Sequence, residues 1–420
     1  MILQSSFLST HQIIDTQQTD CCIVGGGPAG VLLSLLLARQ GISVTLLETH
    51  KDFDRDFRGD TIHPLTMEIM EQLGLADRLL QLPHTKIDQL TLRTTEQDIS
   101  FTADFSHLKT HYPYVTIMPQ ARFLEFLIEE AKQYPHFRLV LGANVQELIE
   151  EDDSIAGVRY RGQGGWHEVK ALLTIGADGR HSRVRELAGL KPVQSSAPMD
   201  VLWFRIPRLP EDGSGLNGRV GKGKMLALLD RSEQWQVAYI IPKGGYQQVR
   251  TEGLAKFRQN LVEVMPEFKD RADTLQDWHQ IAFLSVESSF VPCWYRSGLL
   301  LIGDAAHVMS PVGGVGINYA IQDAVTTANI LTQPLKNKQI QDKDLAAVQR
   351  RREIPTRFIQ AFQSLLQQRL IKSALDEQQT FKAPAFLRLP LFRNLFPRII
   401  GFGLFPVHLK DEFSGLKNNI

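Results

Sequence analysis

The sequence has no surplus of charge of either sign and contains little cysteine. Lys and Arg together number 46, as do Asp and Glu, so the formal net charge is zero. A protein whose main partner is a nucleic acid normally carries a basic surplus, so this balance argues against that role. Three cysteines among 420 residues are too few for a disulfide framework. Free cysteines fit a reducing compartment, and we expect a cytoplasmic protein.

Long apolar runs and several familiar site motifs are also missing. No apolar run approaches the length that crosses a bilayer. The first twenty residues contain no Lys or Arg, so we expect a loose leader there rather than a signal peptide. We find no zinc-ligand spacing, no nucleophile elbow and no Walker-type phosphate loop. The sequence therefore predicts no metal site.

The order of predicted elements indicates an α/β protein with two interleaved sheets. A chain of 420 residues is too long for one compact core, so two or three domains are expected. An apolar strand over Cys21–Val24, an Ala/Leu-rich helix to about Gln40 and a strand over Ser43–Leu47 make one βαβ unit. Alternating polar and apolar residues over 89–105, 201–207 and 225–242 are typical of a half-exposed antiparallel sheet.

The first motif is a glycine-rich turn between the first strand and the first helix. Gly25 permits the tight turn, Gly27 lets the backbone approach a pyrophosphate, and Gly30 lets the helix pack closely on the sheet. The helix N-terminus offers free N–H groups to the phosphates. Glu48, at the end of the second strand, is placed to accept hydrogen bonds from ribose hydroxyls. This motif predicts a dinucleotide site and leaves NAD and FAD as alternatives.

The second motif favours FAD. A buried strand over Leu299–Ile302 ends at Asp304, and a glycine-rich turn then opens a helix near Gly316. Asp304 is placed to bind ribityl hydroxyls. The positive end of the helix stabilises negative charge on the pyrimidine side of a reduced flavin. His307 lies close to Asp304 in the sequence. We interpret it either as a catalytic acid or base or as a histidine packed in the turn, and we favour the second interpretation.

These motifs resemble the para-hydroxybenzoate hydroxylase family of FAD-dependent monooxygenases. The stretch from Ile175 to Arg185, with Asp178-Gly179, resembles the family's DG motif for FAD and NAD(P)H. Arg58-Gly59 and Gln120 resemble two further elements near the cofactor. By this resemblance the residues that hold FAD are Gly25, Gly27, Pro28, Ala29, Gly30, Glu48, Arg58, Gln120, Asp178, Asp304, Pro311, Gly313, Gly314, Gly316, Ile317 and Asn318.

The resemblance also implies the reaction. NAD(P)H reduces FAD, dioxygen forms a flavin C4a-hydroperoxide, and one oxygen is transferred to an aromatic or lipophilic small molecule by hydroxylation or epoxidation. No catalytic base can be named from the sequence. Two alternatives from the same fold are an isoprenoid-saturating reductase and a flavin halogenase. The segment from Trp235 to Pro242 departs from the halogenase pattern Trp-x-Trp-x-Ile-Pro. A non-enzymatic flavin-binding sensor is a third alternative, and the DG motif argues against it.

The expected fold is a Rossmann-type FAD-binding domain interleaved with a mostly antiparallel substrate domain, followed by a helical C-terminal segment. The expected FAD-binding parts are 18–88, 115–196 and 291–340, the substrate-domain parts are 89–114 and 197–290, and the helical region is 341–420. Three aromatic residues in the strand segments have two interpretations: they line a substrate cavity, or they belong to the core. We favour the core for these residues, which are Trp203, Trp235 and Tyr239. The tail from Phe386 to Phe402 mixes large apolar residues with arginines. Three roles are open for it: it caps the body of the protein, it forms a dimer surface, or it contacts a membrane peripherally.

Overall fold

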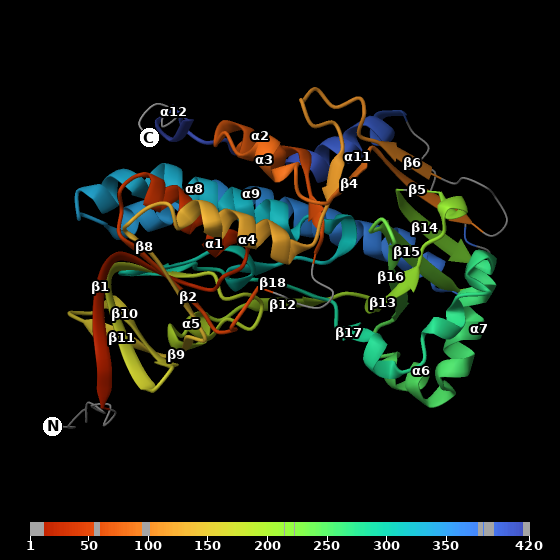
Figure 1. Cartoon of the computed structure of the whole chain (residues 1–420), viewed down its shortest axis with the longest axis horizontal. Helices are drawn as coiled ribbons and strands as arrows, with labels where there is room; N and C mark the ends of the chain where they lie inside the picture. Colours follow the sequence, from red (N-terminus) through yellow and green to blue (C-terminus); the bar gives the residue numbers. More distant parts are fainter. Residues whose placement is uncertain are drawn as a thin grey trace.

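The structure is a computed structural model that describes residues 12–53, 59–94, 101–213, 215–221, 223–376, 381 and 390–414, with the side chains of 390–394 and 414 left aside. Two large sheets organise it (Figure 1). The first sheet has a parallel centre in the order β20-β11-β1-β2-β8, with β19 at one edge and the antiparallel strands β9 and β10 beside β11. Its strands are β1 (Ile13–Val24), β2 (Val44–Glu48), β8 (Phe137–Leu141), β9 (Asn144–Glu151), β10 (Ser154–Gly162), β11 (Gly165–Gly176), β19 (Tyr295–Arg296) and β20 (Leu299–Leu301).

The first strand is longer than expected. β1 begins at Ile13, where it pairs with Trp166 of β11, so the residues from 13 to 20 are strand and the expectation of a loose leader there is wrong. Side chains in this part of β1 are largely exposed, and their polar sequence therefore gave no apolar signal. The paired backbone of β11 supplies the hydrogen bonds that keep the segment extended.

The second sheet has seven strands and is built from two separate parts of the chain. Its order is β17-β13-β16-β15-β14-β5-β6, and its pairs are antiparallel except for β14 and β5. The strands are β5 (Gln89–Thr94), β6 (Phe101–Asp104), β13 (Met199–Pro207), β14 (Leu216–Gly221), β15 (Lys224–Asp230), β16 (Gln234–Pro242) and β17 (Ala282–Leu284). Helices α6 (Tyr246–Glu252) and α7 (Leu254–Val264), which the sequence analysis did not anticipate, interrupt this region. Phe257 and Leu261 of α7 pack on one face of the sheet.

Helices cover the parallel sheet and join the two halves of the molecule (Figure 1). They are α1 (Pro28–Arg39), α2 (Pro64–Gln72), α3 (Ala76–Leu79), α4 (Gln120–Ala131), α5 (Arg183–Leu187), α8 (Gly316–Lys336), α9 (Asp342–Leu366), α10 (Lys372–Ala374), α11 (Pro390–Phe402) and α12 (Asp411–Ser414). A short π-helix, Gln367–Ile371, joins α9 to α10. Two small antiparallel sheets link these parts: β3 (Thr61–Ile62), β7 (Val115–Ile117) and β4 (Thr85–Ile87), and β12 (Val193–Ser196), β18 (Glu287–Phe290) and β21 (His307–Val308).

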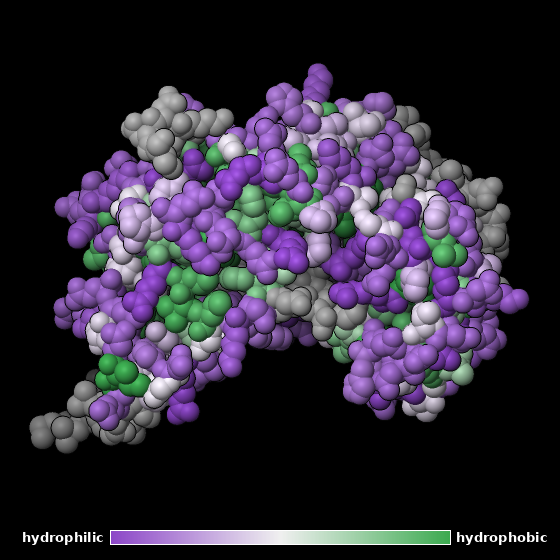
Figure 2. All heavy atoms as spheres, viewed as in Figure 1, coloured by the Kyte–Doolittle hydropathy of each residue, from purple (hydrophilic) through white to green (hydrophobic). Residues whose placement is uncertain are grey.

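The surface reflects this two-part construction. In the view of Figure 2 the molecule is hollowed along its lower edge, between the part with β9 to β11 and the part with α6 and α7. Among the residues that the structure describes, no helix is long and apolar enough to span a membrane. The apolar residues Phe396, Ile399 and Ile400 of α11 are buried against β6 and neighbouring elements, so this part of the tail packs on the body.

Candidate active site

The glycine turn between β1 and α1 has the geometry that its spacing predicts. Gly25 has a φ of +111°, a conformation that side chains rarely adopt. A Cβ at Gly25 would overlap Ala177, and one at Gly30 would overlap the carbonyl oxygen of Gly25. A Cβ at Gly27 would lie 4.0 Å from its nearest contact, the oxygen of Ala177. Gly25 and Gly30 therefore serve the turn and the packing, while the space beside Gly27 stays open.

Glu48 is tied to this turn by its carboxylate. One oxygen accepts the backbone N–H of Gly26 at 2.7 Å, and the other accepts that of His50 at 2.9 Å. Glu48 is buried at the end of β2, the strand beside β1. The acid is thus held next to the glycine turn, at the carboxyl edge of the parallel sheet.

The second motif lies against the same turn. The strand β20 leads into a short 3-10 helix, Gly303–Ala305. A Cβ at Gly303 would lie 3.2 Å from the Cβ of Ala29, so Asp304 belongs to a turn that packs on the first turn of α1. The Arg185 guanidinium donates to the carbonyl of Ala305 at 2.9 Å and to that of Arg180. One arginine thereby joins the DG and GD segments.

Asp178 holds the DG segment in shape. Its carboxylate accepts the hydroxyl of Ser182 and, at 3.0 Å, the backbone N–H of Val184, so it caps the start of α5. Burial raises the pKa of the Asp178 carboxyl, and these hydrogen bonds oppose the rise. These hydrogen-bond partners of Asp178 lie inside its own loop.

The glycine-rich loop that precedes α8 is held by residues of β3 and the chain that follows it. The carbonyl of Gly314 accepts the hydroxyl of Thr61 at 2.9 Å and pairs with Nε2 of His63 at 3.1 Å. Pro311, Gly313 and Gly314 are partly exposed. A Cβ at Gly316, the first residue of α8, would meet no atom of the described chain within 4 Å. The loop therefore borders open space at the N-terminus of a long helix.

Two other residues of the glycine-rich motif, at the start of α8, have side chains that are buried in the protein. Asn318 is fully buried; its side chain accepts the hydroxyl of Thr66 at 3.3 Å and donates to the carbonyl of Gly401. Ile317 is buried and lies beside Gly59, where a Cβ would approach its side chain to 3.4 Å. Both residues hold the loop against its neighbours.

The remaining predicted residues lie near this loop or outside the described chain. Gln120 opens α4, and its backbone N–H donates to the buried carboxylate of Asp60. Asp60 also forms an ion pair with Arg231 of the second sheet. Arg58 lies outside the described residues, so its role stays a prediction.

Sequence reasoning missed a buried ionic cluster behind the GD turn. The carboxylate of Asp323 accepts the backbone N–H of Gly303 at 2.9 Å and Nε of Arg352 at 2.7 Å, and it pairs with Nε2 of His307 at 2.6 Å. Burial raises the pKa of Asp323, but His307 and Arg352 outweigh that effect and lower it to about 2. The signal was an acid, Asp323, in the part of α8 that is buried without interruption, since a buried charge requires partners. His307 is a packed residue, as favoured above.

The three aromatic residues divide between the two faces of the second sheet. Trp235 and Tyr239 belong to the apolar cluster beneath α7, where Trp235 donates to Asp212 at 3.0 Å. Trp203 lies on the opposite face, in a cluster that includes Val312 of the glycine-rich loop. The core interpretation therefore holds for Trp235 and Tyr239, whereas Trp203 borders the loop.

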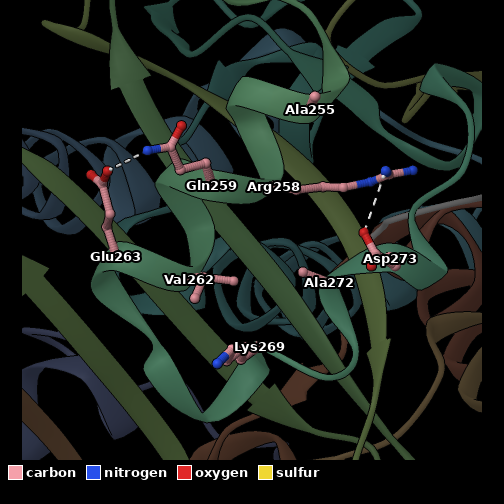
Figure 3. Close-up of a pocket in the computed structure, with 8 residues that line it drawn as sticks. All are labelled: Ala255, Arg258, Gln259, Val262, Glu263, Lys269, Ala272 and Asp273. Carbon is pink, nitrogen blue, oxygen red and sulfur yellow. Dashed lines mark hydrogen bonds and ion pairs between the residues drawn. The ribbon is translucent and has the colours of Figure 1, made fainter.

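Two surface pockets lie elsewhere on the molecule, one far from the glycine-rich loop and one behind it. The first, of about 410 Å³, lies on α7, where Arg258 pairs with Asp273 and Gln259 with Glu263 (Figure 3). It is on the side of the second sheet that faces away from the glycine-rich loop. The second, of about 510 Å³, lies between β12, β18 and α9. It reaches Gln363, which donates to the carbonyls of Ser310 and Val312 and so supports the loop from behind. In the described part of the chain, no group of three or more His, Cys, Asp or Glu is arranged to hold a metal.

Comparisons with known proteins agree with this geometry. The profile of the family described as FAD binding domain matches residues 18–361. The chain is 32% identical to 6-methylpretetramide 4-monooxygenase of Streptomyces rimosus over 390 residues, which cover 92% of this chain and 93% of the relative. It is 26% identical to pentachlorophenol 4-monooxygenase of Sphingobium chlorophenolicum over 305 residues, 72% of this chain and 56% of the relative.

A solved structure shows the same fold. OxyS anhydrotetracycline hydroxylase from Streptomyces rimosus superposes with a TM-score of 0.73 at 22% identity, over 92% of this chain and 76% of the other. The two curated relatives are monooxygenases, so the reductase and halogenase alternatives are not favoured. The open spaces beside Gly27 and Gly316 fit a dinucleotide with a flavin end. The chain belongs to the FAD binding domain family and is an FAD-dependent monooxygenase with NAD(P)H as electron donor.

Proposed function

We propose that this chain hydroxylates an aromatic small molecule, and that FAD is held by the residues which the sequence motifs predict. The observation that carries the proposal is the meeting of three motifs at one edge of the parallel sheet. Arg185 bridges the DG segment to Ala305, and Gly303 packs against Ala29. Ligands of open α/β sheets bind beyond the carboxyl ends of the strands, which is where these motifs meet.

In this proposal the N-terminus of α1, with Gly27, Pro28 and Ala29, binds the pyrophosphate through free N–H groups. Glu48 binds the adenosine ribose, and Asp304 binds the ribityl chain. The N-terminus of α8, with the loop from Pro311 to Asn318, lies beside the flavin ring, where its dipole favours negative charge. Gln120 and Arg58 contact the cofactor, and Asp178 acts through the loop that it caps.

FAD supplies the redox chemistry: it accepts electrons from NAD(P)H and activates dioxygen for transfer of one oxygen atom. The chain positions the substrate and excludes water from the reacting atoms. Apolar side chains on the second sheet, together with Val312, provide such an environment beside the loop. The relatives named for 6-methylpretetramide and pentachlorophenol support an aromatic substrate.

The proposal extends to organisation and location. The division into 18–88, 115–196 and 291–340 for FAD, and 89–114 and 197–290 for substrate, is supported by the two sheets, since β5 and β6 join β13 to β17. We place the protein in the cytoplasm. We do not extend the proposal to membrane contact by the tail, because Phe396, Ile399 and Ile400 are buried.

The test is product mass after incubation of the purified holoenzyme with NADH or NADPH, heavy-isotope dioxygen and a panel of phenols. A product that gains one heavy oxygen supports the proposal, and the faster nucleotide identifies the donor. A product that gains hydrogen alone, formed equally well without oxygen, overturns it.

A further inference from the structure

Three glutamines line the cavity of about 510 Å³ behind the glycine-rich loop. Gln360, Gln363 and Gln367 are spaced by three and four residues along α9 and the π-helix that continues it, so their side chains leave one face of the helix. Their amide groups donate to different parts of the chain, and this difference separates their roles.

Gln363 holds the loop at its start. Its side chain is 1% exposed, and Nε2 donates to the carbonyl oxygens of Ser310 at 2.8 Å and of Val312 at 2.7 Å. Its Oε1 has no hydrogen-bond partner in the described part of the chain, so the hydrogen bonds of this amide go to the loop. Gln367 donates from Nε2 to the hydroxyl of Ser310, which accepts the backbone N–H of Val312 at 3.3 Å. The two glutamines therefore hold the backbone on both sides of Pro311.

These bonds set the direction of the next peptide group. A trans peptide is planar, and its C=O and N–H point in opposite directions. The carbonyl of Val312 points to Gln363, so the N–H of Gly313 in the same peptide points away from α9. Gly313 and Gly314 have φ of +79° and +62°, and the carbonyl of Gly314 is held from β3 by the hydroxyl of Thr61. The loop is thus fixed at both ends, and the N–H of Gly313 lies between the two fixed points.

We propose that Gln363 and Gln367 are positioning residues, which hold the N–H of Gly313 toward the flavin, where it stabilises the negative charge of the reduced ring. Hydrogen bonds to charged groups are roughly twice as strong as those between neutral groups, so this donor favours reduced FAD over oxidised FAD. The inference rests on the proposed function, which places the loop beside the ring, and it adds the residues of α9 that set the reduction potential.

The first measurement is the two-electron reduction potential of the bound FAD, without substrate and without oxygen. Gln363→Met keeps the length of the side chain and removes the donor. We expect it to weaken the binding of reduced FAD relative to oxidised FAD about tenfold, which lowers the reduction potential by about 30 mV. Gln367→Met is expected to lower it by less, because Gln367 acts on the loop through the hydroxyl of Ser310.

Gln360 provides the matched control. It lies one turn before Gln363 and lines the same cavity, and its Nε2 donates to the carbonyls of Ser289 at 2.9 Å and Val308 at 3.0 Å. These carbonyls belong to β18 and β21 and lie outside the loop. Gln360→Met loses the same kind of bonds and should keep the reduction potential of the natural chain. An equal decrease in Gln360→Met and Gln363→Met would show a general loosening of α9 and overturn the proposal.

Chemical rescue tests the hydrogen bonds themselves. Gln363→Ala removes a group of the size of acetamide beside a cavity at the surface. Added acetamide is expected to restore the reduction potential of this variant, whereas N,N-dimethylacetamide, which has no N–H, should not restore it. Equal restoration by both amides would assign Gln363 a space-filling role and overturn the proposal. If Gln363→Ala does not fold, the comparison of Gln363→Met with Gln360→Met decides.

The outcomes separate this inference from the proposed function. Incorporation of heavy oxygen by the natural chain, together with an unchanged reduction potential in Gln363→Met, would overturn the role of the glutamines and leave the proposed function standing. A product without heavy oxygen, together with a lowered reduction potential in Gln363→Met, would overturn the oxygen transfer and support the role of the glutamines.

Discussion

At the residue scale, the loop beside α8 depends on a histidine that must stay neutral. Burial lowers the pKa of His63 to about 4, while its hydrogen bond with the carbonyl of Gly314 opposes this shift. Because a carbonyl oxygen can only accept, the neutral ring carries its proton on Nε2 and donates it to Gly314. Protonation of the buried ring is unfavourable, so acid acts directly on the contact between β3 and the loop.

We expect His63 to make the protein less stable as pH falls from 6.5 to 4. The unfolded chain binds the proton at the ordinary pKa near 6.5 and the folded chain only near 4, so the unfolded state gains protons first. The loss is about 3 kcal/mol below pH 4. Unfolding free energies from urea titrations across this range measure it. His63→Gln, which has no titrating group, should show a smaller slope; identical slopes would contradict the assignment.

Asp323 is expected to stabilise both the fold and the GD turn. Asp323→Asn leaves the buried guanidinium of Arg352 without its counter-charge, which should lower the free energy of unfolding by about 3–5 kcal/mol. Weaker support of Gly303 should also reduce the FAD content of the purified protein. Glu353→Gln, which breaks the partly exposed pair with Arg357, is the control and should change stability by less than about 1 kcal/mol. Equal effects of the two variants would argue against the cluster.

At the element scale, the turn from β1 to α1 separates two uses of glycine. Gly30 makes room for the helix to pack on the turn, and Gly27 leaves room for a ligand. Gly27 has φ −80° and ψ −179°, a conformation open to any residue. The backbone therefore does not require glycine at position 27, and the absence of a side chain there serves ligand binding.

We expect Gly27→Val to fold and to lose FAD affinity, because the added Cβ lies 4.0 Å from its nearest contact and the side chain occupies the open space. Gly30→Ala should fail to fold or be strongly destabilised, since its Cβ overlaps the oxygen of Gly25. Circular dichroism of the apoproteins and FAD titration by fluorescence quenching separate the two effects. A Gly27→Val protein with unchanged FAD affinity would place the pyrophosphate elsewhere.

At the scale of the whole molecule, an ion pair joins the second sheet to the segment that leads into β3. Asp60 precedes β3, and Arg231 lies in the turn between β15 and β16. Burial raises the pKa of the Asp60 carboxyl, and Arg231 opposes that rise. The pair therefore fastens the second sheet to the segment that supports the glycine-rich loop.

We expect Arg231→Met to destabilise the protein by about 3 kcal/mol, because the buried carboxylate of Asp60 loses its ion pair. The double variant Asp60→Asn with Arg231→Met should recover part of the loss, since the charge is then removed as well. Urea titration of Arg231→Met, Asp60→Asn, the double variant and the natural chain gives the coupling free energy between the two residues. Additive effects would show that the two side chains act independently.

Much of the fold and of the site could be predicted because the signals are local. The glycine spacing from Gly25 to Gly30 fixes a turn through backbone sterics alone, and the acid at Glu48 lies one strand away. Residues 13–20 of β1 were missed because their stability comes from pairing with β11, over 140 residues later. The helices α6 and α7 were missed because they lie between strands of the second sheet, and the whole region was expected to be strand.

The sequence by itself determined the unit of β1, α1 and β2 and the glycine turns, since each depends on residues close together in the chain. The cofactor followed from the resemblance of several separate motifs to the FAD-dependent family. Tertiary structure alone decided which face of the second sheet Trp203 and Trp235 occupy relative to the loop. It also decided that Asp323 meets His307 and Arg352. These outcomes depend on contacts between distant segments, and the free energy of burying a polar group is set by partners that local sequence does not specify.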